Sequence, residues 1–121
     1  MKAPARLNLR PRPFNAIKAG SKKVEVRANK PSVRALRESE TLIFVNTETH
    51  EQLSCIIERM TLYPSVRALL LAEGTSETLS STNDLEEGIR SIESIGDYKK
   101  IIAENGVFAI RVKGAVPFLP R

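Results

Sequence analysis

The pattern of apolar and polar positions changes twice within residues 6–27. Residues 6–9 alternate, with both leucines on one face, and predict a short strand. Residues 13–19 carry apolar side chains at helical spacing, and Gly20 follows as a typical helix stop. Alternation returns in residues 23–27, so the sequence predicts a strand, a helix and a second strand in succession.

The rest of the chain contains strong strand signals and several helical patterns. Residues 41–45 are rich in β-branched and aromatic side chains, and the polar residues 46–51 lead into another apolar run, which predicts an antiparallel hairpin. Residues 75–83 are polar, and we expect a mobile loop there. The pattern predicts strands over 41–45, 52–62 and 107–112, helices over 65–73 and 84–95, and shorter helical segments over 32–37, with Ser32 as N-cap, and over 98–104.

These elements together predict an α+β fold. The strands outnumber what one flat sheet with one covering helix needs, so a small, mostly antiparallel β-barrel with helices covering its openings fits the pattern. A length of 121 residues suits one domain over residues 1–121. We expect its core within residues 6–113 and a C-terminal tail over residues 114–121.

The strand predicted at residues 23–27 has a charged face. Val24 and Val26 point to one side, so Lys23, Glu25 and Arg27 share the other. If that face meets water, Glu25 and Arg27 form a weak surface pair. If it lines a cleft, Glu25 holds Arg27 and aims it at an acceptor on a ligand. Alternation alone leaves both interpretations open.

Positive charge is concentrated at the start of the chain. The net charge is +5, but residues 1–37 hold 11 Lys/Arg against a single acid, Glu25, and so carry +10. Residues 38–121, with 8 Lys/Arg against 13 Asp/Glu, carry −5. A basic segment of this kind predicts contact with a phosphate-bearing partner. In the alternative, the basic part pairs with the acidic part within the fold.

Composition argues against several kinds of site. Cys55 is the single cysteine and His50 the single histidine, so no disulfide or zinc-ligand spacing is available, and we expect no metal and no cofactor. No phosphate-binding loop or dinucleotide fingerprint is present. No apolar run is long enough to cross a membrane, and residues 1–14 lack the apolar centre of a secretory signal. The sequence therefore predicts a cytoplasmic protein with no membrane partner, and it indicates no oligomeric state.

Lysine, glutamate and tyrosine side chains remain as candidates for chemistry. Lys22 lies in a tight turn, so alternation does not fix its direction, and at the mouth of a cleft it could contact a phosphate, act as an electrophile or, if desolvated, act as a base. Glu87 lies near the start of a predicted helix, where an acid also simply favours the helix dipole. Tyr63 and Tyr98 could stack a base, although each flanks a helix and suits the edge of a core.

The stretch LNLRPRPFNAIKAGSKKVEVRANKP is similar to the opening of ASCH domains, in the PUA-like superfamily. In that opening a helix ends in glycine, a lysine follows within two residues, and a strand ends in Glu-x-Arg. Gly20, Lys22, Glu25 and Arg27 match that order and spacing. A looser likeness extends over residues 6–113. The resemblance implies a PUA-like β-barrel whose cleft lies between the helix-to-strand turn and the Glu-x-Arg strand, and it implies binding of RNA or a nucleotide.

The resemblance also implies an enzymatic alternative. Some small ASCH domain proteins hydrolyse N4-acetylcytidine, with a turn lysine, a strand threonine and a glutamate from a later helix as proposed active residues. Lys22 falls on that lysine, Glu87 on the glutamate and Glu25 on the threonine position. A glutamate cannot replace a hydroxyl nucleophile directly. In this alternative Lys22 and Glu87 are catalytic and Glu25 positions a water.

Binding of RNA, a nucleotide or a nucleoside is the leading hypothesis from the sequence. Glu25 and Arg27 are then expected to hold a base or sugar. A third hypothesis is a protein-interaction domain in which the cleft is vestigial. Under the leading hypothesis, phosphate contacts come from Lys22, Arg27 and the basic residues Arg10, Arg12, Lys18, Lys23 and Lys30.

Overall fold

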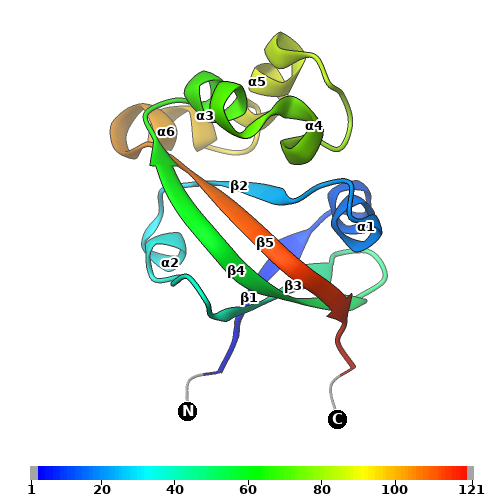
Figure 1. Ribbon diagram of the computed structural model, residues 1–121. Helices are drawn as coiled ribbons and strands as arrows, with labels where there is room; N and C mark the ends of the chain where they lie inside the picture. The colour runs from blue at the N-terminus through cyan, green and yellow to red at the C-terminus, as the bar shows by residue number, and fades with distance from the viewer. Residues whose placement is uncertain (1–2, 120–121) are drawn as a thin grey trace.

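The computed structural model describes residues 3–119 as one curled sheet with helices around it (Figure 1). We call the curled sheet the half-barrel. The strands are β1 (Ala5–Leu9), β2 (Val24–Ala28), β3 (Thr41–Asn46), β4 (Gln52–Tyr63) and β5 (Val107–Pro117). The helices are α1 (Pro11–Ala19), α2 (Pro31–Arg34), α3 (Val66–Glu73), α4 (Thr75–Thr78), α5 (Leu85–Glu93) and α6 (Tyr98–Asn105). The predicted α+β class is confirmed.

The strands lie in the order β1-β3-β4-β5-β2, so β1 and β2 are the two edges of the sheet. β1 pairs with β3 in parallel, whereas β3 with β4, β4 with β5, and β5 with β2 are antiparallel. The sheet is therefore mixed, although mostly antiparallel as predicted. The parallel pair is possible because α1, β2 and α2 lie between β1 and β3 in sequence and give the chain room to cross over.

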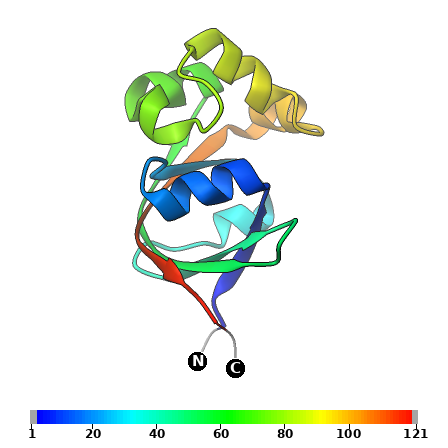
Figure 2. The same ribbon diagram turned by 90° about the vertical axis from the view of Figure 1, so that its right-hand side faces the viewer.

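Two hydrophobic cores lie on opposite sides of β2. Inside the curl of the sheet, β3, β4 and β5 pack against α1 and α2, with Phe14 and Phe44 completely buried. On the other side, Val24 and Val26 pack beneath α3, α5 and α6. Figure 2 shows this helical layer above the half-barrel and α1 lying along it. Because side chains alternate along a strand, this packing directs Glu25 and Arg27 toward the half-barrel.

Two predicted helical details are wrong. Helix α2 begins at Pro31 with Lys30 as its N-cap, so Ser32 is not the cap. Proline starts the helix one residue earlier because its fixed φ already suits the first turn. The predicted mobile loop over residues 75–83 begins with α4, and Thr78 is 1% exposed. The polar composition of this segment concealed a short helix that packs against β2.

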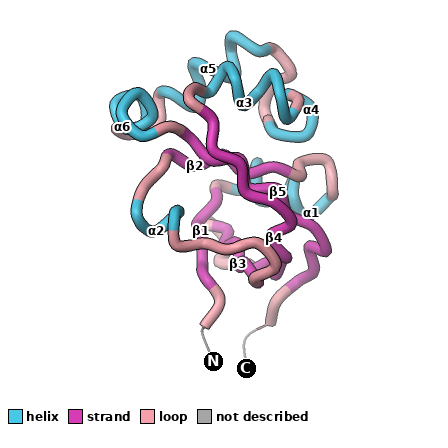
Figure 3. The backbone as a smooth tube through the Cα atoms, turned by 60° about the vertical axis from the view of Figure 1, so that its left-hand side comes forward, coloured by secondary structure: helices cyan, strands magenta, loops and turns pink. Residues whose placement is uncertain are grey.

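Strand β5 is longer than its apolar run predicts. It continues past Val112 to Pro117, because Lys113 pairs with Ile56 and Pro117 with Leu53 on β4. Residues 114–117 of the predicted tail therefore belong to the sheet, whereas residues 120–121 lie outside the described part of the chain. Figure 3 follows the long strands β4 and β5 from the helices down to the end near the two termini.

A bulge interrupts the pairing of β4 with β5. Ile57 pairs with Val112 and Arg59 with Arg111, so Glu58 is the extra residue on β4. Both Glu58 and Arg59 are exposed as a result. The bulge therefore places a carboxylate on the outer face of the sheet, beside the cations of β5.

The single cysteine and the single histidine lie in different surroundings. Cys55 is buried, and burial raises the pKa of its thiol to about 11. His50 is exposed in the turn between β3 and β4. Within residues 3–119, no helix has both the length and the apolar character needed to span a membrane.

Candidate functional site

The end of α1 fixes the direction of Lys22. Gly20 has a φ of 86°, a left-handed conformation that favours glycine, and the backbone N–H groups of Ser21 and Lys22 both donate to the Ala16 carbonyl. The chain therefore reverses within a few residues and carries the Lys22 side chain inward, where only 5% of the residue is exposed. Strand alternation could not predict this direction because Lys22 precedes β2.

The buried ammonium of Lys22 is surrounded by three acceptors. Its Nζ donates to the carbonyls of Val24, at 2.5 Å, and of Thr78, and lies 3.4 Å from Oε1 of Glu25. An ammonium has three donors, so none remains for a ligand in this arrangement. Burial lowers the pKa of Lys22, and the Glu25 carboxylate opposes that shift. Lys22 thus joins α4 to β2 and positions Glu25.

Glu25 links Lys22 to Arg27. Glu25 is only 6% exposed, and its Oε2 accepts a hydrogen bond from Nε of Arg27 at 2.7 Å. The Arg27 Nη2 in turn donates to the carbonyl of Asn8 at 2.6 Å. Asn8 is on β1, so Arg27 connects the two edge strands and closes the half-barrel. The charged face of β2 is therefore an internal network rather than a solvated edge.

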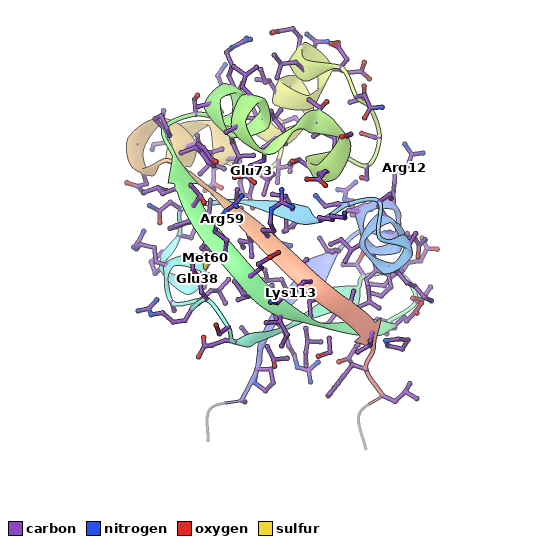
Figure 4. The ribbon with its side chains drawn as sticks, viewed as in Figure 1. Arg12, Glu38, Arg59, Met60, Glu73 and Lys113 are labelled. Carbon is purple, nitrogen blue, oxygen red and sulfur yellow. The ribbon has the colours of Figure 1, made fainter. Side chains whose placement is uncertain are left out.

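Three arginines belong to or contact the junction of β1 and α1. Arg27 donates to the carbonyl of Asn8, two residues before Arg10. Its guanidinium retains N–H groups beyond the two that bind Glu25 and Asn8. Arg10 and Arg12 are exposed, and no side chain of residues 3–119 pairs with either. Figure 4 shows Arg12 projecting away from α1. We call Arg10, Arg12 and Arg27 the arginine surface.

An aromatic ring, that of Tyr98, lies in the second core. Tyr98 packs against the core that contains Val24, Val26 and Ala28, and burial raises the pKa of its phenol. Lys30 Nζ lies 5.5 Å from the centre of the same ring and 3.8 Å from Asp97. The half-buried Tyr98 therefore belongs to the second core, and its cation neighbour is Lys30.

The structure separates the other predicted residues from this network. Lys18 pairs with Glu51 of the β3–β4 turn, and Lys23 lies 3.6 Å from Glu77 of α4. Glu87 is exposed on α5, and its side chain makes no hydrogen bond or ion pair within residues 3–119. Lys22 and Glu25 therefore converge with Arg27, whereas Glu87 does not join them.

The sequence did not reveal a second charged cluster on the outer face of the sheet. Glu73, whose side chain is 2% exposed, accepts from Arg59 at 2.7 Å and from the Tyr63 hydroxyl at 2.5 Å. Arg111 lies 3.5 Å from Glu73 and donates to Glu77 at 2.9 Å. Figure 4 shows Arg59 and Glu73 where β4 meets α3. In the sequence, Glu73 is only an acid at the end of an apolar helix, and that position gives no sign of the partners it meets.

The sequence matches the family model of the ASCH domain over residues 7–113. No functionally curated protein matches it. Among solved structures, the crystal structure of hypothetical protein PH0355 is similar, with a TM-score of 0.78 and 22% identity over 96% of this chain and 100% of that one.

Two further solved structures share the fold. The solution structure of protein PF0455 from Pyrococcus furiosus has a TM-score of 0.71 and 22% identity, and the similarity covers 96% of this chain and 98% of that chain. The crystal structure of ASCH from Zymomonas mobilis has a TM-score of 0.66 and 18% identity, over 93% of this chain and 68% of the other. At these identities the likeness establishes the PUA-like fold, which the sequence predicted, and nothing finer.

Proposed function

The chain belongs to the ASCH domain family, and on that premise we propose that it binds single-stranded RNA or a nucleotide at the arginine surface. In this proposal Arg10, Arg12 and Arg27 contact phosphates. Lys22 and Glu25 are positioning residues that hold Arg27, and they do not touch the ligand. Lys18 and Lys23 contribute less because acids partly neutralise them.

One observation carries the proposal: Glu25 fixes Arg27 while leaving part of its guanidinium unused. The bond to Nε, at 2.7 Å, and the bond from Nη2 to Asn8, at 2.6 Å, hold the group at the end of β1. A guanidinium held in this way loses little further rotamer entropy when it binds a phosphate. Arg10 and Arg12 add two charges that no acid of residues 3–119 pairs with.

The hydrolase alternative receives less support from the same geometry. It needs Lys22 free to act and Glu87 near it, but the Lys22 donors are all engaged and Glu87 lies exposed on α5. Hydrolysis of N4-acetylcytidine stays a prediction, and cytidine release that depends on Lys22 is its measurement. Glu25 contacts both Lys22 and Arg27, as expected of a residue that positions Arg27.

We expect the affinity for a single-stranded RNA oligonucleotide to fall steeply with salt. Each phosphate that a cation contacts changes the slope of log affinity against log salt by about −0.7 for a single strand. Arg12→Gln should therefore reduce the magnitude of that slope by about 0.7 and weaken binding at low salt. Fluorescence anisotropy titrations at several salt concentrations measure both quantities.

Arg37→Gln is the matched control for this experiment. Arg37 is exposed, donates to carbonyls of its own segment and follows α2, which lies across the half-barrel from α1 (Figure 1). Arg37→Gln removes the same charge as Arg12→Gln. An equal loss of RNA affinity in both variants would therefore indicate general electrostatic attraction and contradict the proposed surface. Absence of RNA binding by the unaltered protein at low ionic strength would also contradict it.

A further inference from the structure

The part of β4 that extends beyond β3 has a free edge. Among residues 3–119, β5 is the only strand that pairs with residues 58–63 of β4. In antiparallel sheets, alternate residues direct their backbone N–H and C=O groups to opposite neighbours. Val112 of β5 donates to the carbonyl of Lys23, so every second residue of β5 counted from Val112 bonds to β2. Met60 and Leu62 lie opposite such residues, and their backbone groups therefore point to the free edge.

The carboxylate of Glu38 takes the place of a neighbouring strand at one point of this edge. Its Oε1 accepts a hydrogen bond from the Met60 N–H at 3.2 Å, and Figure 4 shows the two residues beside each other. The Met60 carbonyl and both backbone groups of Leu62 have no partner within residues 3–119. An unpaired edge is a template for another extended chain, and a charged side chain on it opposes unwanted pairing. The edge therefore offers hydrogen bonds that only Glu38 competes for.

A large apolar side chain is exposed at the same edge. Leu62 is 51% exposed and lies against the backbone of Gly106. Phe108 is opposite Leu62 on β5, and Met60 shares this face of the sheet; both are half-buried. Extended peptides that add to a sheet edge gain affinity from main-chain hydrogen bonds and specificity from contacts of alternate side chains. This edge provides both kinds of contact.

Two arginines lie close to the edge. Arg37 immediately precedes Glu38 in the chain. Arg34 donates to the side chain of Asn29, whose backbone N–H donates to the carbonyl of Gly106. Both arginines are exposed, and neither pairs with an acid within residues 3–119. Their charge complements that of an acidic partner.

We propose that this edge of β4 binds an extended acidic segment of a partner protein, which adds to the sheet as a further strand. The backbone of the segment pairs with Leu62 and, in place of Glu38, with Met60. An apolar side chain of the segment lies against Leu62, and its acidic side chains contact Arg34 and Arg37. The proposal goes beyond the proposed function because it needs neither RNA nor the arginine surface.

Nuclear magnetic resonance of the isotope-labelled protein tests the edge with a defined probe, an acetylated octapeptide of alternating glutamate and valine. We expect the Leu62 amide to exchange rapidly with solvent in the free protein and to become protected when the peptide is added. An octapeptide of alternating lysine and valine has the same backbone and should bind more weakly, because the arginines repel it. A glutamate–valine peptide with N-methylated valines lacks half of the backbone donors and should also bind more weakly.

Two variants with matched controls should change the affinity in opposite directions. Glu38→Ala should lower the dissociation constant of the acidic peptide several-fold, because it frees the Met60 N–H and removes a repelling charge. Glu104→Ala removes an exposed acid of α6 and should leave it unchanged. Arg37→Gln should raise the dissociation constant about threefold, whereas Arg90→Gln, on the exposed side of α5, should not.

Several results would overturn the proposal. One is binding of the lysine peptide as tight as that of the glutamate peptide, and another is an equal effect of Glu38→Ala and Glu104→Ala. Protection of the Leu62 amide that grows with protein concentration in the absence of peptide would assign the edge to a second copy of the chain. A Leu62 shift caused by single-stranded RNA and not by the peptide would assign it to RNA. Because Arg12→Gln tests the arginine surface separately, either proposal can fail alone.

Discussion

Replacing Glu25 with glutamine is expected to lower the free energy of unfolding by about 3–5 kcal/mol. Glu25 is buried between Lys22, at 3.4 Å, and Arg27, at 2.7 Å. The variant keeps the shape of the side chain but leaves the buried Lys22 ammonium without a counter-charge and weakens the link between β2 and β1. Urea unfolding followed by circular dichroism measures the loss.

The loss should also depend on pH in a defined direction. Because burial lowers the pKa of Lys22, the folded protein binds fewer protons than the unfolded chain between that lowered value and the ordinary lysine value of about 10.4. Unfolding free energy contributed by Lys22 therefore rises with pH in this window. Removing the Glu25 carboxylate takes away the interaction that raises the pKa of Lys22, so the pH range between the folded and unfolded pKa values widens. The difference in the free energy of unfolding between Glu25→Gln and the unaltered protein should shrink as the pH rises toward about 10.

Glu48→Gln is the control for this variant. Glu48 is exposed in the β3–β4 turn, so its replacement should change stability by no more than about 0.5 kcal/mol. A double variant with Lys22→Met should recover part of the stability that Glu25→Gln loses, because it removes the uncompensated charge. Equal, small effects of Glu25→Gln and Glu48→Gln would show that the network does not hold the half-barrel closed.

The opening stretch shows how far a sequence pattern can predict a site. Alternation correctly placed Glu25 and Arg27 on the face opposite Val24 and Val26, because period two is a property of any strand. It left open whether that face meets water, since the answer depends on β1, which is adjacent only after the sheet curls. The direction of Lys22 depends on the Gly20 turn and on the Thr78 carbonyl, 56 residues away.

The predicted role of Glu87 shows the opposite case. Its position came from resemblance along the chain, which cannot report the rotation of α5 about its own axis. In the structure, Ile92 of that helix is buried and Glu87 is exposed. A one-residue difference on a helix rotates a side chain by about 100°. A resemblance at this level therefore aligns an element without fixing which of its residues reaches a site.

The cluster around Glu73 was beyond prediction for a different reason. Its partners Arg59, Tyr63 and Arg111 come from β4 and β5, and only the bulge at Glu58 together with the β4–β5 register brings them beneath the end of α3. Charged residues scattered over 53 positions of sequence carry no periodic signal. In the folded chain these residues surround the carboxylate of Glu73, which is almost fully buried. Replacing Glu73 is therefore a second strong test of the fold.

Glu73→Gln is expected to destabilise the protein by about 2–3 kcal/mol, because buried or half-buried donors lose a charged acceptor. Arg59 keeps half of its side chain in water and recovers part of its solvation there. Arg111, with 20% of its side chain exposed, has less access to solvent and keeps only Glu77. Glu104→Gln is the control, since Glu104 is an exposed acid in the last turn of the equally long helix α6.

A second readout separates loss of the cluster from general loosening of the fold. The hydrogen bond to Glu73 is the main reason that the pKa of Tyr63 is raised, followed by burial. In Glu73→Gln the phenol should therefore ionise at lower pH, while Tyr98, whose pKa burial raises, should not change. The chain contains two tyrosines and no tryptophan, so ultraviolet absorbance of the phenolate reports these two groups alone. An unchanged Tyr63 titration together with unchanged stability would mean that Glu73 does not anchor α3 to the sheet.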